Sequence, residues 1–373
     1  MKKLKLFSRL ALFLNLILVC CLLLSYAAPY ISPAQFWPIA FFGLALPYLL
    51  IINSVFLVYW ALKGSKYFFL TLMLFALGYK SIPTLIQFDF NAFSKVSFNK
   101  EEGLKVLSFN VRIFDLYMWS KDRGTRNKIL EFLEEEDPDI LCLQEFYYQK
   151  VPDSVYEFKT LDTLEELLSA KYYHVENTIQ LNNDHFGIIT FSKHPIVDKG
   201  IVSIGAESDN ICIYTDILLN EDTLRVYNGH LSSIKLDKHD YKAIRGLNKI
   251  EYSESFGKEK MILRKLKQSF QQRAIQADSV GLHIKNSPHP VIFCGDFNDT
   301  PSSYAYRQIR GELEDAFMDS GSGLGQTYIG DFPSFRIDYI FYDSQFSSLN
   351  YTTHPEELSD HHPISATLNF KKE

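Results

Sequence analysis

The first 90 residues of this 373-residue chain are so apolar that they constrain its fold more than any other feature. Two apolar runs cover residues 10–28 and 36–62, and a third starts at Tyr67. A helix needs about 20 apolar residues to cross the hydrocarbon core of a bilayer. The first two runs reach that length, and the third spans only if Lys80 extends to the interface. We therefore expect about three transmembrane helices and a multi-pass membrane protein.

Basic residues predict the orientation of these helices, because Lys and Arg concentrate in cytoplasmic loops. They precede the first run and separate the second from the third: Lys2, Lys3, Lys5, Arg9, Lys63 and Lys66. Three spans place the rest of the chain outside the cytoplasm, which is the arrangement we expect, whereas two spans would place it inside. Two other interpretations stay open. Residues 1–28 resemble a signal peptide, and residues 1–90 could form a buried helical hairpin of a soluble protein.

The rest of the chain has the composition of an ordinary soluble domain. We expect a membrane region at 1–90, a polar linker at 91–103 and a soluble domain at 104–373. Residues 91–373 hold 31 Lys and Arg against 43 Asp and Glu, a formal charge of −12. Such a domain binds nucleic acid poorly unless it carries a local basic patch.

Short strands and a few helices alternate along the soluble domain. Runs rich in Val, Ile, Phe and Tyr, such as 105–111, 139–145 and 289–297, are typical of strands. Amphipathic helices are expected at 125–137, near 161–170 and at about 258–285. This pattern predicts a layered α/β fold with packed sheets.

One segment departs from the acidic background, because residues 235–273 carry eleven Lys and Arg against five acids. It can be interpreted as the solvated face of a helix. It can also be interpreted as a basic arm that contacts phosphate or an anionic membrane surface.

Polar side chains stand where several apolar strands end. They are Asn110, Glu145, His230, Asp296, Asn298, Asp338, Asp360 and His361. Strand ends of an α/β sheet face a crevice where ligands bind, so these groups are expected to converge. Each one alone is more often a helix cap or a turn residue.

The stretches SFNV, QE, NGHL, GDFN, RIDYIF and SDHHP, in this order, resemble the endonuclease/exonuclease/phosphatase superfamily. That group includes deoxyribonuclease I-like nucleases, abasic-site endonucleases, neutral sphingomyelinases and inositol-polyphosphate phosphatases. The resemblance covers residues 104–370. It implies a four-layer α/β sandwich of two packed mixed sheets flanked by helices. It also implies hydrolysis of phosphoester bonds that depends on Mg²⁺ or Mn²⁺.

The resemblance implies ligands for that metal and contacts for the substrate phosphate. Glu145 and Asn110 are expected to bind the metal, and Asp360 to reach it or a water on it. Arg112 stands where abasic-site endonucleases carry a second acid, which places a two-metal arrangement in doubt. Arg112 and Arg273 are candidates for the substrate phosphate, although a structural salt bridge is the interpretation we favour for Arg273.

The resemblance also implies the acid and base groups. Asp296 is expected to orient or deprotonate the attacking water, and Asn298 to donate to the phosphate. His361 is expected to act as general acid or phosphate donor, with its tautomer fixed by Asp338. His230 is expected to donate to the leaving group or the phosphate.

Nuclease activity is our first prediction, because it is the commonest activity in the superfamily. A sphingomyelinase-like lipid phosphodiesterase is the main alternative, favoured by the membrane region and by His230, and a phosphoinositide phosphatase fits less well. A catalytically silent, membrane-anchored binding domain is an alternative of another class. Nucleic acid or phospholipid is thus the expected substrate, the bilayer is the expected partner, and no protein partner follows from the sequence.

Overall fold

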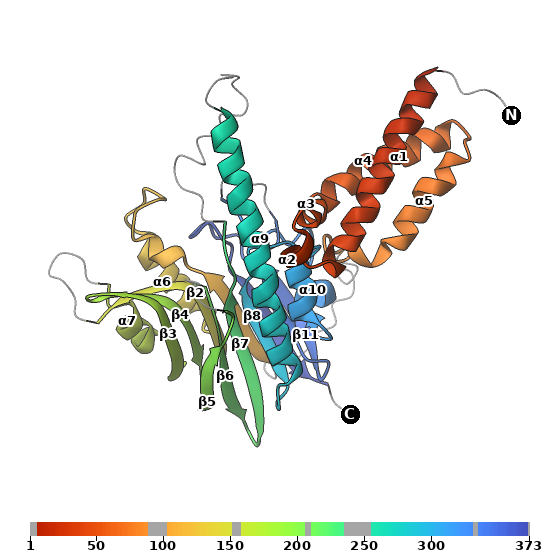
Figure 1. Cartoon of the computed structure of the whole chain (residues 1–373). Helices are drawn as coiled ribbons and strands as arrows, with labels where there is room; N and C mark the ends of the chain where they lie inside the picture. The colour runs from red at the N-terminus through yellow and green to blue at the C-terminus, as the bar shows by residue number, and fades with distance from the viewer. Residues whose placement is uncertain are drawn as a thin grey trace.

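Two packed six-stranded mixed sheets form the centre of the molecule (Figure 1). The computed structural model describes residues 6–88, 103–150, 158–205, 210–234, 255–330 and 335–371. Sheet one has the order β11-β12-β1-β2-β4-β3, and sheet two has the order β5-β6-β7-β8-β10-β9. The predicted sandwich of two mixed sheets flanked by helices is confirmed.

The strands of sheet one are β1 (Leu104–Asn110), β2 (Ile140–Gln149), β3 (Tyr172–Leu181), β4 (Asp184–Ser192), β11 (Phe346–Thr353) and β12 (Ile364–Phe370). Those of sheet two are β5 (Ile196–Val202), β6 (Ile211–Leu219), β7 (Asp222–His230), β8 (Val291–Asp296), β9 (Glu314–Asp315) and β10 (Asp338–Tyr342). Helices α6 (Thr125–Glu136) and α7 (Thr160–Leu167) flank sheet one, whereas α9 (Ser255–Lys285) and α10 (Tyr304–Arg310) flank sheet two.

Alternation along the strands divides the core into layers, because successive side chains point to opposite faces. Val106 of β1 and Ile292 of β8 lie in one buried cluster between the sheets. Leu107 of β1 packs instead with the side chains of α6 and α7, and Phe293 of β8 packs with those of α9 and α10. Both faces of the central strands are therefore buried, which explains their nearly continuous apolar sequences.

Several elements were missed by the sequence prediction. Strand β5 carries exposed charged residues at its centre, and β11 is rich in Ser, Asn and Thr, so neither has the apolar signature of a strand. Helix α9 begins at Ser255, close to the expected start. Most of the predicted linker and residues 235–254 of the basic segment lie outside the described residues.

The N-terminal region corrects the expectation of three membrane-spanning helices. Among the described residues, one helix, Leu6–Tyr30, is long and apolar enough to cross a membrane, counting α1 (Leu6–Ala27) with the short helix after it. Helix α2 (Pro33–Phe36) ends where the second apolar run begins. The run itself is divided into α3 (Ile39–Leu44) and α4 (Leu46–Leu62), because prolines start both helices. Helix α5 (Tyr67–Leu77) is shorter still. The helix lengths therefore support one span rather than three.

Helices α1, α4 and α5 nevertheless pack together as one bundle, which a buried polar cluster joins. The side-chain oxygen of Asn15 in α1 accepts hydrogen bonds from Trp60 Nε1 of α4 at 2.9 Å and Thr71 Oγ1 of α5 at 3.3 Å. All three side chains are fully buried. Polar contacts of this kind fix the relative positions of apolar helices that otherwise have few specific interactions.

The bundle is attached to the sandwich through several specific contacts (Figure 1). The Phe41 and Phe270 rings meet edge to face at 5.3 Å, and the Arg307 guanidinium lies 4.3 Å from the Tyr30 ring. Buried Arg336 makes a two-pronged ion pair with Asp315 and also donates to the Thr84 carbonyl at 3.1 Å. The apolar region thus contacts the sandwich two residues away from Asp338.

Candidate active site

The sheet topology brings the predicted strand-end residues to one end of the sandwich. Strand β1 runs parallel to β2, and β7 runs parallel to β8, with His230 in register with Asp296. Strand β10 is antiparallel to β8 and starts with Asp338 opposite Asp296. Strand β12 is antiparallel to β1, so His361, just before β12, lies near the end of β1. Gly295 must be glycine here, because a Cβ atom would lie 2.0 Å from the carbonyl oxygen of Gly229.

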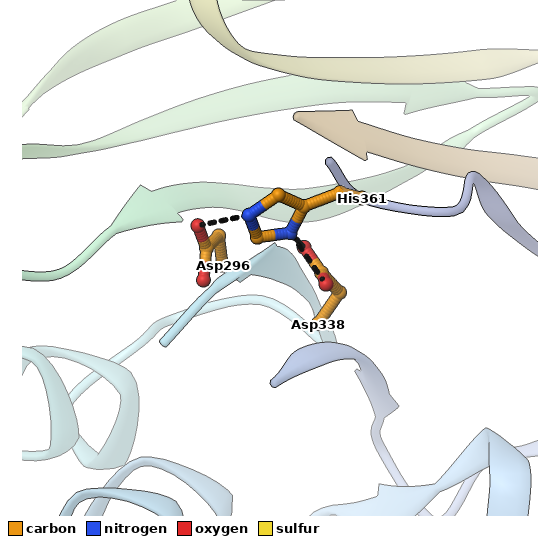
Figure 2. Close-up of side chains that lie close together, drawn as sticks. All are labelled: Asp296, Asp338 and His361. Atoms are coloured by element: carbon orange, nitrogen blue, oxygen red, sulfur yellow. Dashed lines mark hydrogen bonds and ion pairs between the residues drawn. The ribbon is translucent and has the colours of Figure 1, made fainter. Parts of the chain in front are cut away.

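His361, Asp338 and Asp296 form a buried charged cluster (Figure 2). The Nδ1 atom of His361 lies 2.9 Å from Asp338 Oδ2 and 3.2 Å from its Oδ1. Its Nε2 atom lies 3.7 Å from Asp296 Oδ2. The ring is therefore oriented by Asp338, as predicted for a histidine whose tautomer a carboxylate fixes.

The electrostatic environment favours the protonated form of His361. Burial alone would lower the pKa of this imidazole, but the charges of Asp338, Asp296 and Asp360 raise it well above its ordinary value. Burial raises the pKa of Asp296, and the nearby His361 opposes that shift. The cluster can thus hold a proton on His361 at neutral pH and keep a base beside it.

Replacing Asp338 by asparagine is expected to move the basic limb of the pH–rate profile to lower pH. The Asp338 charge raises the pKa of His361, so its removal lowers that pKa. A reaction that needs the imidazolium proceeds below this pKa and is lost above it, and the loss then begins at lower pH. The profile of kcat/KM against pH measures this shift. The control is Asp198→Asn, which removes an exposed carboxylate. A basic limb that stays unchanged in Asp338→Asn would contradict the assignment of His361 as the acid.

Glu145 and Asn110 form the second part of the site. Glu145 lies at an irregularity of β2 between Leu143 and Phe146, with a φ of 49°, and its carboxylate is half-exposed. The amide nitrogen of Asn110 donates to Glu145 Oε1 at 3.3 Å and to Asp296 Oδ2 at 3.0 Å. In this arrangement Asn110 holds two carboxylates near each other, and its oxygen accepts from the backbone N–H of Arg112.

His230 completes this part of the site. Its Nε2 atom lies 3.6 Å from Asp296 Oδ2 and 3.8 Å from Glu145 Oε1. This buried nitrogen has no hydrogen-bond partner among the described residues. The Nε2 atom of His230 therefore lies between two carboxylates, at distances longer than a hydrogen bond. This position is consistent with a donor to a phosphate.

The carboxylates fit a hard divalent cation, which prefers oxygen ligands and keeps several of its waters. Glu145 would hold Mg²⁺ or Mn²⁺, because its carboxylate is accessible, and Asp296 lies beside it. The ligand atoms of Asp296, Asp338 and His361 also lie within 4.8 Å of one another. The hydrogen bond between His361 and Asp338 already engages two members of that second group, so Glu145 stays the predicted metal ligand.

Asn298 positions Asp296 in this structure. It follows β8 with a left-handed φ of 52°, which Asn tolerates better than most residues. Its backbone N–H donates to Asp296 Oδ1 at 2.7 Å, and its amide nitrogen lies 3.2 Å from both Asp296 Oδ2 and the Leu231 carbonyl oxygen. These two acceptors engage the amide nitrogen of Asn298, so its contact with a substrate phosphate stays a prediction.

The two candidate arginines differ in position. Arg112 Nε lies 3.3 Å from Asp360 Oδ2, and its guanidinium is half-buried and stacked 4.3 Å from the Trp119 ring. Arg273 is almost fully buried and binds Asp299 at 3.0 Å and the Ser232 carbonyl at 2.8 Å. The geometry favours the structural salt bridge for Arg273 and leaves Arg112 as the arginine next to the site.

Sequence reasoning missed several residues that support the site. Gln144 Nε2 donates to Asn228 Oδ1 at 2.7 Å and joins the two sheets directly below Glu145 and His230. Thr327 Oγ1 accepts the backbone N–H of Asp338 at 3.1 Å. Gln144 directly precedes Glu145, and Asn228 stands two positions before His230. Their position next to predicted site residues is the signal by which the sequence could have identified them.

Comparisons with known proteins agree with this geometry. Residues 107–361 match the model of the endonuclease/exonuclease/phosphatase family, and residues 6–85 match a domain of unknown function, DUF8431. A family protein from Bacteroides thetaiotaomicron is similar in structure, with 18% identity, a TM-score of 0.52, and coverage of 72% of this chain and 95% of that one. The human Nocturnin catalytic domain with a bound sulfate anion is also similar, with 18% identity, a TM-score of 0.50 and the same coverage. No curated protein matches the chain by sequence.

Proposed function

The chain belongs to the endonuclease/exonuclease/phosphatase family, and from that premise we propose that it is a phosphodiesterase that depends on Mg²⁺ or Mn²⁺. The observation that carries the proposal is the arrangement of His361. Its ring is hydrogen-bonded to Asp338, faces Asp296, and stands at the same end of the sandwich as Glu145 and His230.

Each side chain has a role that its contacts support. When bound, the metal would polarise the phosphate and lower the pKa of water. Asp296 would orient or deprotonate that water, and the backbone N–H of Asn298 donates to its carboxylate. Protonated His361 and the free nitrogen of His230 donate to the charge that develops on the phosphoryl oxygens and the leaving group. A catalytically silent binding domain is disfavoured, because every one of these positions holds a competent side chain.

We propose that α1 attaches the enzyme to a membrane. Arg9 stands near its start and the sandwich follows its other end, so a cytoplasmic N-terminus places the sandwich outside the cytoplasm. Nuclease activity remains the first prediction for the substrate. One observation favours a lipid phosphodiester as the second candidate, because the apolar bundle contacts Arg336, two residues from Asp338.

A substrate panel tests this function. The full-length protein in detergent is incubated with plasmid DNA, single-stranded DNA, RNA, sphingomyelin and inositol phosphates, each with Mg²⁺, Mn²⁺ or chelator. We expect turnover of at least one phosphodiester that the chelator abolishes and the metal restores. Turnover of sphingomyelin alone would reverse the order of the two candidates, and no turnover of any substrate would refute the proposed enzyme.

A further inference from the structure

Helix α9 extends past the sandwich at the end that holds the site. Its C-terminal part packs on sheet two through fully buried residues such as Ala277 and Val280. Ser269 Oγ donates to the Ser233 carbonyl at 3.0 Å, and Ser233 follows the end of β7 by three residues. Because α9 leads back to the start of β8, residues before Ser269 lie beyond the strand ends. We call residues 260–268 the α9 tip.

The α9 tip has the surface of a helix that contacts a membrane face. Lys260 and Arg264 are exposed, and the partly exposed Lys265 and Lys267 bring the basic residues of the tip to four. The apolar side chains of Met261 and Leu263 are 38% and 45% exposed among these charges. Basic and apolar residues together suit the boundary between anionic headgroups and acyl chains.

The end of the α9 tip lies close to α2, which packs beside the middle of α9 (Figure 1). Lys267 Nζ lies 5.8 Å from the Trp37 ring, and the Gln271 amide reaches the Ala34 carbonyl at 3.5 Å. Trp37 and the exposed Tyr30 follow the end of the apolar helix α1. Aromatic residues at such a position mark the interface between hydrocarbon and water. Lys267, near the end of the tip, therefore stands at the level where α1 would leave a bilayer.

From these contacts we infer that the α9 tip binds the anionic phospholipid surface of the membrane that α1 enters. The inference rests on the proposed membrane attachment through α1 and adds a second contact of different chemistry. Nucleic acid is the less favoured ligand, because a phosphate backbone gives no partner to Met261 and Leu263. The contact turns the end of the sandwich that carries Asp296 and His361 toward the bilayer. Phosphoesters presented at the membrane surface then reach the site directly.

Depth measurements on the full-length protein in lipid nanodiscs test this contact. A spin label is placed at Leu263→Cys, with Cys20→Ser and Cys21→Ser to remove the accessible natural thiols. The control label is at Leu282→Cys, which is 62% exposed near the other end of the same helix. In discs containing phosphatidylglycerol we expect label 263 to be accessible to oxygen and protected from an aqueous nickel reagent. Label 282 is expected to stay aqueous. Equal aqueous exposure at both positions would overturn the inference.

Charge reversal tests the lipid specificity. The variant Lys260→Glu/Arg264→Glu/Lys267→Glu is expected to return label 263 to water, whereas the control Lys199→Glu/Lys285→Glu leaves it protected. Protection that is equal in phosphatidylcholine discs, or that survives the triple reversal, would overturn the role of anionic headgroups. If label 263 is aqueous in the protein without charge reversal, and the protein binds DNA in a way that the triple variant loses, the tip is assigned to nucleic acid instead.

A separate measurement distinguishes failure of this inference from failure of the proposed function. Hydrolysis of bis(p-nitrophenyl) phosphate in detergent reports the catalytic cluster without a membrane surface, and we expect the triple variant to keep wild-type turnover. A loss of that activity would show that the tip serves the site itself and would overturn its assignment to lipid. Absence of activity in the wild type would refute the phosphodiesterase, while the label depth would still decide the membrane contact.

Discussion

Replacing His361 by alanine is expected to lower turnover by about 10²- to 10⁴-fold, the usual contribution of a positioned acid or base. Replacing its neighbour His362 by alanine is expected to change turnover by less than about threefold, since a side chain away from the reacting atoms contributes little of this effect. The assay is steady-state hydrolysis of bis(p-nitrophenyl) phosphate by the two variants side by side.

The structure explains this difference between adjacent histidines. His361 is buried against Asp338 and faces Asp296. The ring nitrogen Nδ1 of His362 lies 3.2 Å from the Glu356 carbonyl, and its backbone N–H donates to the Thr327 carbonyl at 2.7 Å. A similar loss in both variants would contradict the assignment.

A folding control is needed, because His361→Ala leaves the Asp338 carboxylate buried without its partner. The variant His361→Asn keeps a donor at this position and removes the ring that titrates. If it folds with an unchanged melting temperature and still loses turnover, the loss is chemical. Turnover near the wild-type level in a folded His361→Asn protein would refute a catalytic role.

The residues of the site could be predicted because strand ends combine two independent signals. Asp296 and His230 each follow an apolar run, and parallel β7 and β8 place the ends of both runs at the same edge. The apolar runs predicted the position of each residue, and the parallel connection through α9 explains why the two residues meet. The alternating strands likewise predicted two packed sheets.

Other parts depend on contacts that local sequence does not encode. The apolar run at 36–62 looks continuous, but Pro38 and Pro47 divide it into two helices, α3 and α4. The link from Arg336 to Thr84 joins residues 252 positions apart in the chain. Arg273 matched a motif for either phosphate or a salt bridge, and only its burial beside Asp299 favours the salt bridge. Tertiary packing decided each of these cases.

The second large effect is expected for Glu145→Gln, which keeps the shape of the side chain and removes its charge. We expect loss of the metal-dependent turnover by at least about 10²-fold, because catalysis in such sites depends mainly on electrostatic stabilisation of the transition state. The affinity for Mn²⁺, measured by calorimetric titration of the full-length protein in detergent, is expected to fall in parallel. The exposed Glu312→Gln serves as the matched control.

This titration also decides between the two groups that could hold the metal. If Glu145 holds it, Glu145→Gln weakens Mn²⁺ binding and His361→Asn leaves it close to wild type, because the ring of His361 is engaged by Asp338. If the buried group of Asp296, Asp338 and His361 holds the metal, His361→Asn weakens Mn²⁺ binding and Glu145→Gln leaves it close to wild type. In that second case, the metal would displace the proton that His361 and Asp338 share. His361 could then no longer serve as the acid, and the division of roles proposed for the site would be wrong.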